Sequence, residues 1–133
     1  MTQPTILFVC THNAGRSALG AALARKQVGD RAVVLSAGID PADTASAGTI
    51  ASLAEVGIDD SAHTPTRITE DLVRSATVVV AMKPGLDIPQ VDGVAYETWD
   101  RPNPQGWEAP AIRPLRHHID ARVAELLSRV APG

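Results

Sequence analysis

Residues 4–17 read PTILFVCTHNAGRS, and this stretch decides how the chain is expected to fold. Its apolar run from Ile6 to Val9 is short and ends abruptly at Cys10, which is typical of a buried parallel strand. Small and polar residues follow up to Arg16 and Ser17, where an alanine-rich helical pattern begins. The pattern therefore predicts a strand, a tight loop and a helix, with Cys10 at the carboxyl end of the strand.

Strands and helices are expected to alternate along the rest of the chain. Apolar runs and helical spacing predict further strands over 31–37, 77–82 and 94–98, and helices over 16–28, 45–56, 69–75 and 110–130. Such alternation is typical of a parallel sheet with helices on both faces. We therefore expect one α/β domain over residues 1–133, a three-layer α/β/α arrangement around a four-stranded parallel sheet. Ligands of such sheets bind beyond the carboxyl ends of the strands, which is where Cys10 is placed.

Composition narrows the functional classes. The chain has 133 residues, and its 12 basic and 15 acidic residues give a net charge of −3, which favours neither a nucleic-acid partner nor an anionic membrane surface. No apolar stretch reaches the length of a membrane span, and the first residues do not resemble a signal peptide, so a cytoplasmic location is expected. Because Cys10 is the single cysteine, a redox reaction would need its second sulfur from another molecule.

The loop after Cys10 combines a nucleophile with donors for an oxyanion. A helix N-terminus and a nearby cation both favour the thiolate form of a cysteine. The guanidinium of Arg16 offers a planar fork of donors that suits a tetrahedral oxyanion, and the loop N–H groups add more. An inert cysteine buried at a strand end is the alternative. The composition of the loop and the presence of Arg16 favour a reactive cysteine over an inert one. The oxyanion is expected to be bound by Thr11, His12, Asn13, Ala14, Gly15 and Arg16.

The sequence CTHNAGRS resembles the phosphate-binding loop shared by low-molecular-weight protein tyrosine phosphatases and the thiol-dependent arsenate reductases. The segments LSAGIDP at 35–41, LAEVGID at 53–59, TVVVAM at 77–82 and the stretch 99–104 resemble the same superfamily in the same order. The resemblance covers nearly the whole chain. It implies a low-molecular-weight phosphatase-like fold with flavodoxin-like topology.

Two departures from the patterns of these families indicate which branch of the superfamily the chain resembles. The phosphatases usually place a glycine two residues after the nucleophile and often a second cysteine before the arginine, whereas His12 and Gly15 stand there. Thioredoxin-coupled arsenate reductases carry two more cysteines after the third strand, but 82–89 reads MKPGLDIP. The chain therefore resembles the single-cysteine arsenate reductases that pass arsenate to mycothiol.

The general acid of this superfamily is the aspartate of an Asp-Pro pair in the last long loop. The matching pair is Asn103-Pro104, and a carboxamide cannot donate the proton that an ester's leaving group needs. Asp100 lies three residues earlier and is the candidate substitute. Arsenate loses only water or hydroxide, so the missing acid should cost an arsenate reductase less than a phosphatase.

The resemblance implies an arsenate reductase, or arsenate-thiol transferase, with no bound cofactor or metal. Cys10 would attack arsenate, Ser17 would hydrogen-bond its sulfur, Asn13 would brace the loop, and an external thiol with a glutaredoxin-like mycoredoxin would complete reduction to arsenite. A tyrosine phosphatase with a phosphocysteine intermediate, or an oxyanion binder that has lost turnover, are the alternatives. His63, His117 and His118 have no metal-site spacing and are expected at the surface, as are Arg113 and Arg116. Trp99 and Trp107 flank the last long loop, either shaping the mouth of the site or packing.

Overall fold

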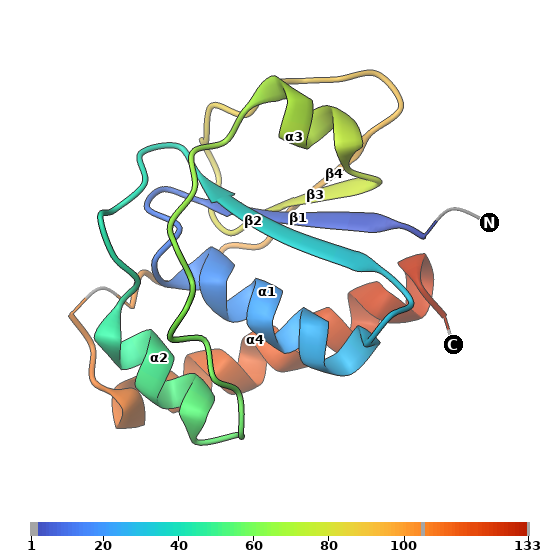
Figure 1. The fold of residues 1–133 in the computed structure, drawn as a ribbon. Helices are drawn as coiled ribbons and strands as arrows, with labels where there is room; N and C mark the ends of the chain where they lie inside the picture. Colours follow the sequence, from blue (N-terminus) through green and yellow to red (C-terminus); the bar gives the residue numbers. More distant parts are fainter. Residues whose placement is uncertain (1–2, 105, 133) are drawn as a thin grey trace.

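The structure, a computed structural model, describes residues 3–104 and 106–132. They form four strands and four helices (Figure 1). In chain order they are β1 (Thr5–Cys10), α1 (Arg16–Val28), β2 (Val33–Gly38), α2 (Ala47–Ala54), α3 (Glu70–Ser75), β3 (Val78–Ala81), β4 (Ala95–Thr98) and α4 (Ala109–Val130). Strands and helices alternate along the chain except that α2 is followed by α3 and β3 by β4.

The strands form one four-stranded sheet in the order β2-β1-β3-β4, and every neighbouring pair is parallel. Cys10 pairs with Gly38 at the end of β2, and Val9 pairs with Ala81 at the end of β3. The chain leaves β1 toward β2 on one side and returns to β3 on the other. This reversal is the switch point at which open α/β sheets bind ligands, and Cys10 lies on it.

Helices cover both faces of the sheet, as the sequence predicts. Figure 1 shows α1, α2 and α4 on one face and α3 on the other. On the first face, Phe8 meets the buried Trp99 edge to face, with ring centroids 5.8 Å apart. On the second, Leu7 and Val79 pack with Val73 of α3. The α/β/α layers and the four-stranded parallel sheet are therefore confirmed.

The helix boundaries follow local signals closely. α1 has the predicted bounds and ends at Gly29, whose φ of 58° is easily adopted only without a side chain. α3 begins after Thr69, whose hydroxyl accepts a hydrogen bond from the N–H of Leu72, as predicted. α2 is shorter than expected, because Ser46 caps it by accepting from Thr49 N–H.

The second strand was expected over 31–37, and β2 instead ends one residue later. Gly38 is the last residue of β2, where a Cβ would lie 2.8 Å from the carbonyl oxygen of Thr11 and 3.0 Å from Asn13. The glycine therefore lets the loop after Cys10 pack directly on β2.

Arg116 corrects a second expectation, because it does not face solvent. Its side chain on α4 is buried, and its guanidinium donates to the carbonyl oxygen of Ser52 at 2.7 Å and pairs with Glu55 at 2.9 Å. Arg113 also pairs with Glu55, at 2.8 Å. These contacts join α4 to α2. Within the described residues, no helix is long and apolar enough to cross a membrane.

Candidate active site

Cys10 is held at the carboxyl end of β1 by contacts to its sulfur. Its side chain is 2% exposed, and its Sγ lies 2.9 Å from the hydroxyl of Ser17 in the first turn of α1. The N–H of Asn13 donates to the same sulfur at 3.3 Å. The predicted hydrogen bond between Ser17 and Cys10 is therefore present. Because the Ser17 hydroxyl accepts from the side-chain amide of Asn13, its own proton is available for the sulfur.

The loop between β1 and α1 turns its carbonyl oxygens toward the segment that follows β2. Backbone N–H groups of that segment donate to them: Ile39 to Cys10 at 3.1 Å, Asp40 to Thr11 at 2.8 Å, Ala42 to His12 at 3.0 Å and Ser46 to Ala14 at 3.1 Å. Within the described residues, the N–H groups of His12, Ala14, Gly15 and Arg16 donate to no acceptor. A run of unpartnered N–H groups at a helix N-terminus is the usual form of an anion site.

Asn13 braces the loop from inside, as predicted. It is fully buried with a φ of 53°, a left-handed conformation that asparagine tolerates better than most residues. Its amide nitrogen donates to the Ser17 hydroxyl at 2.8 Å, and its amide oxygen accepts from the N–H of Thr66 at 2.9 Å. One side chain therefore couples the loop, α1 and the segment before α3.

His63 was expected to be a surface residue, and that expectation was wrong. It is half-buried, and its Nε2 lies 2.7 Å from the carbonyl oxygen of Asn13. Because a carbonyl only accepts, Nε2 must be the donor. His117 and His118 are exposed, as predicted. Nothing in the sequence marks His63 as different, since its partner lies 50 residues away.

Arg16 has unused hydrogen-bonding capacity despite its burial. It is 7% exposed, and one terminal nitrogen donates to the carbonyl oxygen of Arg101 at 3.2 Å. Its Nε has no partner within the part of the chain that the structure describes. A buried polar atom normally has a partner, so the unpartnered Nε is available to a ligand that accepts hydrogen bonds.

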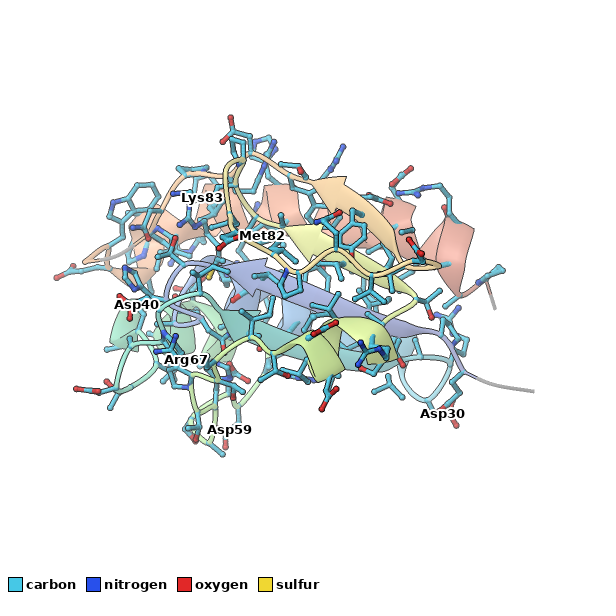
Figure 2. The ribbon with its side chains drawn as sticks, turned by 90° about the horizontal axis from the view of Figure 1, so that it is seen from above. Asp30, Asp40, Asp59, Arg67, Met82 and Lys83 are labelled. Atoms are coloured by element: carbon cyan, nitrogen blue, oxygen red, sulfur yellow. The ribbon has the colours of Figure 1, made fainter. Side chains whose placement is uncertain are left out.

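A cavity of about 790 Å³ opens onto this loop. Its floor comes from the loop after β1, one wall from residues 40–48 and the other from Asn103 and residues 106–108. It lies at the end of the sheet where Figure 2 shows Asp40, Met82 and Lys83, while Asp30 lies at the opposite end. The described lining residues are Cys10, His12, Ala14, Gly15, Arg16, Asp40, Pro41, Ala42, Asp43, Thr44, Ala45, Ser46, Ala47, Gly48, Asn103, Gly106, Trp107 and Glu108.

The structure brings most of the predicted site residues together, but not all of them. Thr11 and Asn13 belong to the loop without lining the cavity. Asp100, the proposed substitute acid, is exposed and is not among the lining residues, whereas Asn103 is. The side chains of Trp99 and Trp107 differ in the same way: Trp99 packs in the core and Trp107, 38% exposed, lines the cavity.

Sequence reasoning missed the three carboxylates of the cavity walls. Asp40, Asp43 and Glu108 line it, although no local pattern sets them apart from the other acidic residues. Only the folding of two distant segments toward the same loop reveals them. Among the described residues, no group of three His, Cys, Asp or Glu side chains is arranged to hold a metal ion.

A buried cysteine at the end of a parallel strand, an N–H nest and an arginine at the start of the next helix form the arrangement expected of a thiol site for an oxyanion. The family described as low molecular weight phosphotyrosine protein phosphatase matches residues 5–87, and the chain belongs to this family.

Curated relatives of the chain are named as arsenate reductases. Arsenate reductase 1 of Staphylococcus epidermidis is 30% identical over 98% of this chain and 100% of its own length. A candidate arsenate reductase from Halobacterium salinarum is 31% identical over 94% of this chain and 92% of its own.

Solved structures agree with both the fold and the family. The thioredoxin-dependent arsenate reductase of Corynebacterium glutamicum superposes with a TM-score of 0.84 at 31% identity, covering 96% of this chain and 62% of that one. The chain thus spans less than two thirds of that protein. An arsenate reductase in its reduced state gives a TM-score of 0.85 at 26% identity and covers 99% of that chain.

Proposed function

We propose that this protein is an arsenate reductase that transfers arsenate from Cys10 to an external thiol. The observation that carries the proposal is the combination of an intact thiol and oxyanion loop with Asn103, not a carboxylic acid, in the cavity. A phosphate ester needs an acid to protonate its leaving oxygen, and arsenate does not depend on one to the same extent. The curated relatives named as arsenate reductases support the same choice.

In the first step, the Cys10 thiolate attacks the arsenic of bound arsenate. A sulfur–arsenic bond forms, an arsenic–oxygen bond breaks, and the leaving oxygen departs as water after taking protons from solvent. The N–H groups of His12, Ala14, Gly15 and Arg16 and the free Nε of Arg16 would hold the other oxygens. Ser17 steadies the sulfur before attack and after its release.

In the second step, the sulfur of an external thiolate displaces Cys10 at arsenic, which remains arsenic(V). A thiol of a glutaredoxin-like partner then attacks the sulfur of this thiol–arsenic adduct. The sulfur–arsenic bond breaks and its electron pair stays on arsenic, which is released as arsenite. The external thiol and the partner are left joined by a mixed disulfide. Because the chain has a single cysteine, both reducing sulfurs come from other molecules. Mycothiol with a mycoredoxin is the pair that we propose.

A tyrosine phosphatase is the second candidate, since the family that matches residues 5–87 carries that description. In that reaction Cys10 would form a phosphocysteine, and Asp100 would have to move to reach the leaving group. Asp100 is exposed and lies outside the cavity lining, so this route needs a rearrangement that the arsenate route does not.

The deciding experiment measures arsenite release from arsenate with mycothiol and a mycoredoxin, beside hydrolysis of an aryl phosphate by the same preparation. Cys10→Ser is the control in both assays. Arsenite that depends on Cys10, with negligible ester hydrolysis, is the expected result. Efficient hydrolysis without arsenite would establish the phosphatase instead. Inactivity in both, with a melting temperature raised by phosphate, would identify an oxyanion binder.

A further inference from the structure

We propose that the cavity selects its thiol co-substrate by charge, accepting neutral hydroxyl-bearing thiols and disfavouring anionic ones. The inference rests on the proposed function, because it names the co-substrate class for that same site. It is carried by the size of the cavity, by the carboxylates in its walls and by the position of Trp107.

The cavity is far larger than one tetrahedral oxyanion. Its volume of about 790 Å³ lies within the range for sites that bind small organic molecules. The oxyanion would occupy only the floor, where Arg16 and the N–H groups have unused donors. The space between the two walls therefore remains for a second molecule, and Cys10 lines the same cavity.

The charges around that space are mostly negative. Asp40, Asp43 and Glu108 line the cavity, and none of them forms an ion pair within the described residues. Of the described lining residues, Arg16 alone carries a permanent positive charge, and its free donor is assigned to the oxyanion.

Asp40 contributes less to this argument than the other two carboxylates. The exposed guanidinium of Arg67 donates to the carbonyl oxygen of Ile39, next to Asp40 in the chain, and offsets part of its charge. In the part of the chain that the structure describes, no arginine or lysine side chain bonds to Asp43, to Glu108 or to a chain neighbour of either. These two exposed carboxylates, one in each wall, therefore carry the charge selection.

The walls are held in place by close packing. A Cβ at Gly48 would collide with the carbonyl oxygen of Trp107, and a Cβ at Gly15 would lie 2.9 Å from the ring of Pro104. Gly48 therefore allows Trp107 to lie directly on α2, and Gly15 allows Pro104 to lie directly on the loop. Glu108, the residue before α4, is thereby kept beside the cavity.

A thiol entering between these walls meets Asp43 and Glu108 and, on the floor, a bound oxyanion. An anionic thiol is repelled by all three, and little counter-charge is present to offset the repulsion. Hydroxyl groups of a neutral thiol can instead donate to the carboxylates, and the exposed indole of Trp107 offers an apolar face for its carbon skeleton. The chemistry of the walls therefore fits a neutral, hydroxyl-bearing thiol.

The first test compares arsenite formation driven by thioglycerol, which is neutral and carries hydroxyls, with that driven by thioglycolate, which is anionic. Rates are expressed per concentration of thiolate, at low ionic strength and in the presence of the same disulfide-reducing partner. We expect thioglycerol to be favoured about fivefold, and added salt to reduce that ratio. In the double variant Asp43→Asn, Glu108→Gln the preference should fall to less than about twofold. Asp87→Asn, at an exposed carboxylate outside the cavity lining, is the matched control and should keep the original ratio.

A second readout does not depend on arsenate turnover. Cys10 is the single cysteine, so its alkylation by iodoacetate (anionic) and iodoacetamide (neutral) can be followed by intact mass. The double variant should raise the ratio of the iodoacetate rate to the iodoacetamide rate severalfold, while Asp87→Asn leaves it unchanged. If no thiol yields arsenite, the proposed function fails and the alkylation ratio still decides this inference. Ratios that the double variant leaves unchanged would overturn it.

Discussion

The floor of the cavity and its walls are built in opposite ways. In the floor, residues 10–17, backbone donors engage the carbonyl oxygens of Cys10, Thr11, His12 and Ala14, and the side chains of Asn13, Arg16 and Ser17 are buried. The walls, residues 40–48, Asn103 and residues 106–108, are largely irregular, and Asp43, Trp107 and Glu108 are exposed.

This difference separates chemistry from partner choice. Attack on arsenic or phosphorus needs the nucleophile and its donors to be placed accurately, which the bonded, buried floor provides. Choice of a diffusing thiol by charge acts over several ångströms and tolerates exposed side chains. Changes in the floor should therefore affect all reactions of the protein, whereas changes in the walls should alter the choice of substrate or thiol.

Arg16→Lys should have the largest effect, because lysine has neither the fork of donors nor the free Nε. We expect kcat/KM for arsenate to fall about a hundredfold and the melting-temperature shift caused by phosphate to shrink. Arg74→Lys, at an exposed arginine of α3, is the control and should retain both. A loss of less than about threefold would mean that the loop N–H groups bind the oxyanion without the guanidinium.

Asn103→Asp, in a wall of the cavity, should shift the substrate preference from arsenate toward phosphate esters while leaving the structure of the floor unchanged. A carboxylic acid at this position can protonate a leaving oxygen, so hydrolysis of an aryl phosphate should rise about tenfold or more. Arsenite formation should change less than about threefold. Asp100→Asn tests the rival assignment: a large loss of hydrolysis in that variant would show that Asp100 already serves as the acid.

His63→Ala should weaken the floor from outside the cavity. Removal of the donor to the carbonyl oxygen of Asn13 leaves that oxygen without its imidazole partner, and we expect unfolding in urea to require about 1–3 kcal/mol less. Phosphate should also bind more weakly, because the loop is less rigid. His118→Ala, at an exposed position of α4, should change neither quantity. Equal effects of the two substitutions would contradict a bracing role for His63.

The smallest effect concerns the contacts that hold α2, and with it one wall, against α4. The hydrogen bond from Arg113, followed by that from Arg116, lowers the pKa of Glu55 from 4.5 to about 2. A carboxyl group whose pKa is lower in the folded state stabilises the protein fully above its unfolded pKa, and that stabilisation is lost as the pH falls toward the folded pKa. The stability contributed by Glu55 should therefore decline as the pH falls from about 4.5 toward about 2.

Melting temperatures of the wild-type protein and Glu55→Gln, measured at about pH 6 and about pH 3, check this sign. The gap between the two proteins should be wider at the higher pH. Glu70→Gln, at an exposed ion pair with Arg74 on α3, provides the comparison for an ordinary surface carboxylate. A gap that widens at the lower pH would contradict the assignment.

Local patterns were sufficient to predict most of the fold. Short apolar runs identified the strands, and capping residues such as Thr69 and Gly29 placed helix ends within a few residues. Errors arose where a distant contact overrides a local signal. The second strand was expected over 31–37, yet it includes Gly38, where the approach of the loop after Cys10 requires a glycine.

The features of the site also divide into those predicted by local sequence and those set by distant contacts. The sequence by itself determined the order of nucleophile, loop, arginine and serine, because these residues lie close together in the chain and their spacing implies their geometry. The tertiary structure alone decided that His63 braces Asn13, that Arg116 is buried against α2, and that Asp43 and Glu108 line one cavity while Asp100 lies outside it. These relations join residues tens of positions apart. Their cause is the packing of whole elements, for which a side chain's local sequence carries no signal.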